Sequence, residues 1–272
     1  MIFHEIETNG IGYLDLLFDM SGVPEELLPY VGILQAVLGV IDTTHYEYGE
    51  LFNEINVHTG GIGTSLELYP DVTKVKEKEF KATFEIKAKA LYEKLSVAFD
   101  MMGEILTESK LEDEKRLLEI LQMLKSRLLM RFQSAGHTTA VLRSLAYTSP
   151  SARLKDLTSG IEFYRVVARI TEHFEEEKED LIRKLKSLAV RLFRAEGMMI
   201  SYTASREGLD GLEDLVDSMK KRLFTDSVEE AVCILHCEKK MKASRLLRRC
   251  SMWPDPETLL MAAPNTAVRS RY

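Results

Sequence analysis

Cysteine is scarce in this sequence, and its scarcity excludes the disulfide-rich class of small secreted proteins. Three cysteines occur among 272 residues, and Cys233, Cys237 and Cys250 all lie near the C-terminus. An odd number of cysteines does not suggest a disulfide framework. His236 lies between the first two, but a structural zinc ion usually takes four ligands from two closely spaced pairs, and no second pair follows. We therefore expect no metal site in this segment.

Long apolar runs and an excess of positive charge are also missing. No run approaches the roughly 20 apolar residues that a membrane-spanning helix needs. We see no basic start followed by an apolar core, and so we expect no signal peptide. The net charge of −7 argues against a nucleic-acid partner. The composition is that of an ordinary soluble globular protein of one or two domains, and the expected location is cytoplasmic.

The motifs that carry catalysis are absent as well. No histidine has a second histidine four residues away, so the zinc-peptidase motif H-x-x-E-H does not occur. His4 and Glu5 begin an H-E-x-x-H pattern, but Thr8 stands where the second ligand is needed. The glycines of residues 60–63 resemble part of a phosphate-binding loop, yet no G-K-[ST] follows. We predict no catalytic residue and no metal ligand in this chain.

Apolar and polar residues alternate in segments that predict strands, at 11–18, 62–69, 78–89 and 198–204. The segment 78–89 is the most regular, with an apolar face opposite a polar face of Lys81, Thr83, Glu85, Lys87 and Lys89. Such alternation is typical of an antiparallel sheet with one solvated face. Asn9-Gly10, between residues 2–7 and 11–18, predicts a hairpin turn because both residues tolerate positive φ.

Helices are predicted for most of the remaining chain. Thr44-x-x-Glu47 and Ser109-x-x-Glu112 each match a capping box, and apolar stripes at helical spacing follow them. Acidic residues at 175–180 suit the start of a helix. Further helices are expected at 24–38, 91–102, 137–147, 161–174, 181–193 and 208–224. We therefore predict an α+β fold, an antiparallel sheet of four to five strands covered on one face by helices.

Five short motifs follow one another along the chain. They are T-N-G-I-x-Y at 8–13, P-E-E-L-x-P-Y-V at 24–31, T-G-G-I at 59–62, S-A-G-H-T-T-A at 134–140 and L-x-x-x-x-S-G-I ending at Ile161. Through these motifs, in this order, residues 1–225 resemble the third domain of presequence proteases, in the insulinase/pitrilysin class of zinc metallopeptidases (subfamily C). The chain looks like a fragment of such an enzyme.

The resemblance implies a sheet covered by helices and a non-catalytic role. In that family the first half binds zinc, and the second half closes over it to enclose a chamber for unstructured peptides. The family's R-x-x-G-A-Y motif is absent here, so the resemblance carries over no catalytic residue. This chain would hold no cofactor itself, and zinc would belong to the full-length enzyme. Its partners would be the remaining domains, in the same or a neighbouring polypeptide.

Two other functions stay open at this point. A free-standing module on the same fold could bind a peptide or a partner protein through its helical face or its sheet edge. An enzyme with an unrecognised site is the third, although no metal or nucleophile motif supports it.

The last part of the sequence differs from the rest. We predict one domain over residues 1–226, followed by a linker and a frame-shifted, poorly packed tail over 227–272. From residue 241 onward six basic residues oppose two acidic ones, and the only tryptophan, Trp253, lies there. Back-translation in the alternative frame yields a strand-like sequence similar to the start of the family's fourth domain. Lys239-Lys240 marks an A-rich tract where one added base would shift the frame.

Overall fold

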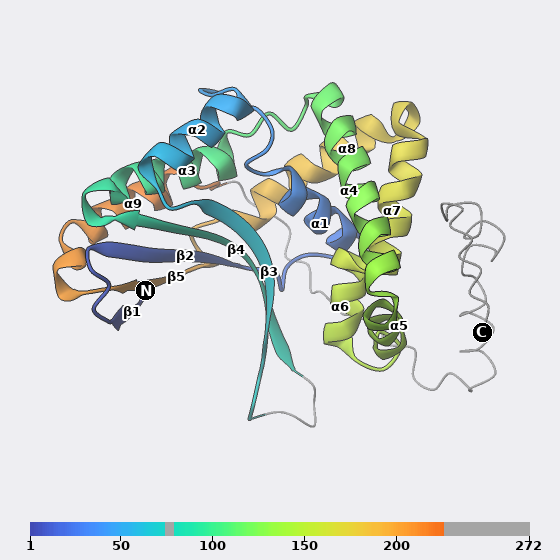
Figure 1. The fold of residues 1–272 in the computed structure, drawn as a ribbon, viewed down its shortest axis with the longest axis horizontal. Helices are drawn as coiled ribbons and strands as arrows, with labels where there is room; N and C mark the ends of the chain where they lie inside the picture. The colour runs from blue at the N-terminus through green and yellow to red at the C-terminus, as the bar shows by residue number, and fades with distance from the viewer. Residues whose placement is uncertain (74–78, 226–272) are drawn as a thin grey trace, which may run out of the picture.

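The fold is a twisted five-stranded sheet with helices on one face and a helical lobe beside one edge (Figure 1). The computed structural model describes residues 1–73 and 79–225. The predicted tail over 227–272 lies outside the described residues. Helix and sheet in one compact unit confirm the predicted α+β class.

The sheet has the strand order β1-β5-β2-β4-β3. Its strands are β1 (Ile2–Glu5), β2 (Ile11–Asp19), β3 (Ile62–Pro70), β4 (Phe80–Leu91) and β5 (Met198–Ala204). The pairs β5–β2, β2–β4 and β4–β3 are antiparallel, and β1 lies parallel to β5. β3 and β1 are therefore the two edge strands.

The predicted hairpin at Asn9-Gly10 is wrong in its strand pairing, although the turn itself forms. Asn9 and Gly10 have φ values of 51° and 83°, in the left-handed region that such a turn needs. However, β5 lies between β1 and β2, and its Thr203 is opposite both His4 and Tyr13. The turn reverses the chain, but β5 takes the central place in the sheet.

The helices are α1 to α9 in chain order. Their bounds are α1 Leu28–Val37, α2 Tyr48–His58, α3 Leu95–Thr107, α4 Glu114–Ser134, α5 Gly136–Leu145, α6 Pro150–Ser159, α7 Ile161–Glu172, α8 Phe174–Leu192 and α9 Leu212–Arg222. The acidic run lies in the first turns of α8, as predicted, where negative charge favours the helix dipole.

Both predicted capping boxes are wrong by about one helical turn. The N-cap of α2 is Glu47, which forms a capping box with Glu50, and the N-cap of α4 is Asp113. Thr44 and Ser109 instead lie at the C-terminal end of α3, where their hydroxyls bond to groups of that helix and its cap. Those hydroxyls are thus already used, and each new helix begins further along the chain.

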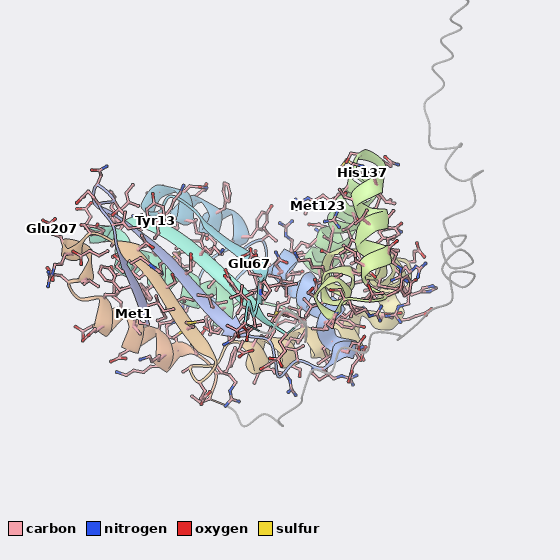
Figure 2. All side chains as sticks on the ribbon, turned by 90° about the horizontal axis from the view of Figure 1, so that it is seen from below. Met1, Tyr13, Glu67, Met123, His137 and Glu207 are labelled. Atoms are coloured by element: carbon pink, nitrogen blue, oxygen red, sulfur yellow. The ribbon has the colours of Figure 1, made fainter. Side chains whose placement is uncertain are left out.

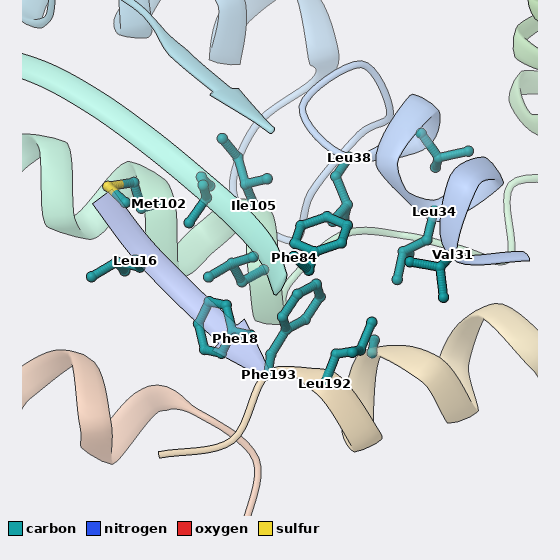
Figure 3. Close-up of a cluster of buried hydrophobic side chains, with 14 of the residues drawn as sticks. Leu16, Phe18, Val31, Leu34, Leu38, Phe84, Met102, Ile105, Leu192 and Phe193 are labelled. Carbon is teal, nitrogen blue, oxygen red and sulfur yellow. The ribbon is translucent and has the colours of Figure 1, made fainter. Parts of the chain in front are cut away.

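The main core lies between the sheet and the helices (Figure 3). Phe193, just after α8, packs edge-on against Phe18 of β2 and Phe84 of β4, with ring centroids 5.3 and 5.2 Å apart. Helix α1 packs against β3 as well as against α4, α6, α7 and α8. It therefore joins the sheet to the helical lobe of α4–α8, and it sets the distance between β3 and α4.

Candidate functional site

The face of the sheet opposite α3 carries a polar cluster in its centre (Figure 2). The strand register places Glu85 of β4 between Ser65 of β3 and Leu17 of β2. Lys87 lies two residues along β4, opposite Asp15 of β2. Because these residues share one face of the sheet, their side chains lie together although they come from three strands.

The prediction of a solvated face is wrong at this point of the sheet. Thr83 and Glu85 are each only 1% exposed, although they lie on the polar face of β4. Lys81 and Lys89, nearer the ends of the strand, are exposed as predicted. Neighbouring long side chains on adjacent strands cover the centre of the face, which the alternation along one strand does not reveal.

Three donors satisfy the buried carboxylate of Glu85. The Tyr69 hydroxyl and the Thr83 hydroxyl donate to its Oε1 at 2.6 and 2.7 Å, and Lys87 Nζ lies 2.9 Å from its Oε2. The hydrogen bond to Glu85 raises the pKa of Tyr69 and also that of Lys87. With these partners the carboxylate is held in place, and it stiffens the β3–β4 ribbon.

Asp15 adds a second carboxylate to the cluster. Burial raises its pKa, the positive charge of Lys87 opposes this effect, and the negative charge of Glu85 adds to it. The cluster contains no cysteine or histidine. It offers fixed charge and hydrogen bonding on the sheet surface rather than a nucleophile with its base.

Metal and membrane sites were sought across the part of the chain that the structure describes. Within residues 1–73 and 79–225, no group of three or more His, Cys, Asp or Glu side chains is arranged to hold a metal ion. In the same residues, no helix is both long and apolar enough to cross a membrane. Cys233, His236 and Cys237 lie beyond these residues.

A groove of about 680 Å³ lies between β3 and α4, with α1 at its base. Apolar residues of α1, α2, α4 and β3 form much of its lining, among them Phe52, Ile55, Ile62 and Leu124. The glycine segment 60–63, which resembles part of a phosphate loop, ends α2 and enters β3 at this groove. Gly61 has a φ of 118°, which favours glycine there.

Two arginines of α4 border the groove. Arg127 is exposed, while Arg131 donates to the main-chain carbonyl of Ser159 at the end of α6. Burial lowers the pKa of Arg131. Sequence reasoning missed this groove, because its two walls are about 60 residues apart in sequence and meet only through α1.

Comparison with known proteins gives a consistent result. The family model for the domain associated with peptidases of the insulinase/pitrilysin class, subfamily C, matches residues 1–170. Protein HypA of Clostridium perfringens is 31% identical over 229 residues, which are 84% of this chain and 23% of that protein. The mitochondrial presequence protease of Eremothecium gossypii is 26% identical over 216 residues, covering 77% of this chain and 21% of that protein.

A third relative and a solved structure extend this result. Presequence protease 1, chloroplastic/mitochondrial, of Arabidopsis thaliana is 23% identical over 214 residues, covering 78% of this chain and 19% of that protein. A crystal structure of a conserved protein from Enterococcus faecalis V583 shares the fold with a TM-score of 0.59 at 13% identity, covering 86% of this chain and 51% of that chain. This chain therefore spans about a quarter or less of the curated relatives' length, and it belongs to the family of peptidase-associated domains of subfamily C.

Proposed function

We propose that this chain is a non-catalytic domain of an insulinase-type zinc metalloendopeptidase that degrades unstructured peptides. It would supply part of the wall of the peptide chamber and contacts between domains. The observation that carries this proposal is the one-sided sheet. Helices cover one face, and the other face presents an ordered polar surface around Glu85, with no described helix over it (Figure 2). A smooth, polar wall suits a chamber that must hold peptides without binding them tightly.

Exposed apolar side chains on the helical lobe support contacts between domains. Met130 of α4 is 61% exposed, and Val141 of α5 is 58% exposed. Leu145 of α5 and Met123 of α4 are also exposed. The two helices pack against each other, so these side chains belong to one region of the lobe. Exposed apolar surface of this kind is typical of a face that a partner covers.

Zinc would be bound by another domain of the enzyme. The described residues of this chain bring together no set of ligands that fits the ion. The partners of the chain are then the remaining domains, in the same or a neighbouring polypeptide. We also keep the domain limits 1–226 and the cytoplasmic location as proposals. Subcellular fractionation would test the location, since the relatives include proteins named as mitochondrial.

The test begins with the DNA that precedes the codon for Met1. We expect it to encode H-x-x-E-H, and we expect its purified product, combined with this chain, to cleave a fluorogenic unstructured peptide. A chelator should abolish the cleavage, and neither part alone should show it. An unrelated preceding reading frame, or no cleavage by the combined parts, would contradict the proposal.

A free-standing binding module is the second candidate, and the groove beside β3 favours it. An edge strand with a groove is a common way to hold a peptide. An unrelated preceding reading frame together with peptide binding by the isolated chain would support this candidate over the first.

A further inference from the structure

The groove exposes main-chain groups of β3 that β4 does not use. β3 is the last strand of the sheet, so one of its edges pairs with β4 and the other borders the groove. At this outer edge, the side chain of Gln35 donates to the carbonyl of Thr64 at 3.3 Å, and the Thr64 hydroxyl donates to the carbonyl of Gln35 at 3.1 Å. The carbonyl of Thr64 therefore points away from β4 and toward the groove.

Backbone groups alternate in direction along a strand, which extends this conclusion to neighbouring residues. Ile62 presents its N–H and C=O on the same side as Thr64, whereas Gly63 pairs with β4. Gly61 and Gly63 leave room, since a Cβ at either would meet no atom within 4 Å. An open row of donors and acceptors beside glycines is a template for another extended chain.

The charge of the groove selects the kind of chain. Its charged lining residues are Arg127 and Arg131, and no aspartate or glutamate lies among the described residues that line it. They are four residues apart on α4 and so lie on one side of that helix. The protein as a whole has a net charge of −7, so this local positive surface is unusual. Guanidinium groups bind carboxylates with two parallel hydrogen bonds.

We propose that this groove binds a separate, extended, acidic peptide. The peptide would pair with the outer edge of β3 at Ile62 and Thr64, displacing the Gln35 side chain, and would place carboxylates against Arg127 and Arg131. A second copy of this chain fits less well, because edge-to-edge pairing would bring four arginines together. The inference does not rest on the proposed role in a peptidase, since the isolated chain is tested.

The first experiment compares two labelled, blocked hexapeptides by fluorescence anisotropy with the 272-residue chain. One alternates valine with glutamate, and the other alternates valine with lysine. We expect the glutamate peptide to bind at least about tenfold more tightly, the effect of one good charge pair. Equal binding of the two peptides, or binding of neither, would overturn the proposal.

Charge reversal on the protein gives the second experiment. Arg127→Glu should weaken binding of the glutamate peptide by at least about tenfold. Arg183→Glu is the matched control, because Arg183 is on α8, outside the groove, with a side chain 77% exposed, and it should leave binding unchanged. Circular dichroism should show the same unfolding midpoint for both variants. Unchanged binding by a folded Arg127→Glu variant would overturn the proposal, and the peptide comparison on the unaltered chain decides if that variant does not fold.

N-methylated peptides test the main-chain pairing directly. Methyl groups on the valine nitrogens block one edge of the extended peptide, and those on the glutamate nitrogens block the other. We expect one of the two sets to lose binding and the other to keep it. Equal binding by both sets and the parent would contradict pairing with β3. A dimer in light scattering that the acidic peptide does not dissociate would also overturn the proposal, since a second copy would then occupy the groove.

Discussion

Tyr69 donates a hydrogen bond of 2.6 Å to Glu85, across the β3–β4 ribbon and on the face of the sheet opposite the helices. The two residues are offset along the ribbon, since Glu85 is paired in register with Ser65. Tyr69 itself is half exposed, so its ring covers the carboxylate like a cap. This contact explains how a charged residue becomes buried on a face without helices.

Replacing Glu85 should change the ionisation of Tyr69. The bond to Glu85 raises the pKa of Tyr69, because it stabilises the neutral hydroxyl that donates the proton. Glu85→Gln should therefore lower the pKa of Tyr69 toward its ordinary value of about 10. Ultraviolet difference titration measures this shift, and Tyr69→Phe identifies the signal among the other tyrosines. Identical titration curves for the wild type and Glu85→Gln would contradict the assignment.

A methyl group at Gly32 should disrupt the contact between α1 and α6. A Cβ there would lie 2.4 Å from the main-chain carbonyl of Thr158. We expect Gly32→Ala to lower the free energy of unfolding by about 1–3 kcal/mol, the usual effect of overpacking. Gly49→Ala in α2 is the matched control, because a Cβ there meets nothing within 4 Å. By helix propensity it should be neutral or stabilising by up to about 1 kcal/mol. Urea unfolding measures both, and equal effects would contradict the packing argument.

Asp156 should be the most sensitive charged residue of the helical lobe. It is fully buried, forms an ion pair with Arg143, and accepts a hydrogen bond of 2.9 Å from the N–H of Ile161. Asp156→Ala leaves Arg143 without this partner, and removing one member of a buried pair destabilises by about 3–5 kcal/mol. Asp217→Ala is the control, and it should change stability far less, because water solvates both members of the exposed pair of Asp217 with Lys220.

A double-mutant cycle isolates this pair. Asp156→Ala combined with Arg143→Met should destabilise less than the sum of the two single variants, since neither charge is then left alone. Additive effects in denaturant unfolding would show that the pair contributes little.

Glu104 should make stability depend on pH. Burial alone would raise its pKa, but hydrogen bonds from Thr43 and His45 outweigh burial and hold the pKa below its usual value. The stabilisation is therefore fully present above the unfolded pKa of about 4.3, and is lost as the pH falls through the lower folded pKa. Glu104→Gln should be less stable than the wild type at pH 7, by about 1–3 kcal/mol.

Below pH 4 the difference between Glu104→Gln and the wild type should shrink. Glu213→Gln, at an exposed position in α9, is the control and should differ little from the wild type at either pH. Unfolding curves at several pH values measure these differences. A gap between Glu104→Gln and the wild type that stays constant from pH 7 to pH 3 would contradict the role of this carboxylate.

Resequencing tests the proposed frame shift in the C-terminal part, which lies outside the described residues. We expect one added base within codons 236–245, near Lys239-Lys240. Its removal should open the alternative frame with its strand-like sequence. Confirmation of the frame as given, with an early stop in the alternative frame, would end the hypothesis.

The amino-acid sequence alone determined the elements that depend on local chemistry. Alternation predicted the strand at 198–204 with the bounds that β5 has, and Pro150 begins α6 as expected of proline in a first helical turn. The order of five short motifs pointed to the same family as the family model. Period, turn and cap residues act within a few positions, so the sequence contains them directly.

Tertiary structure alone decided which strands pair, which polar groups are buried, and where the groove lies. β5 separates β1 from β2, although the turn at Asn9-Gly10 suits a hairpin. Glu85 is buried because Tyr69, 16 residues earlier, returns to it on the next strand. Arg127 lies near β3 because α1 packs against both β3 and α4. Each of these depends on contacts between residues far apart in the chain, which periodicity along one segment cannot specify.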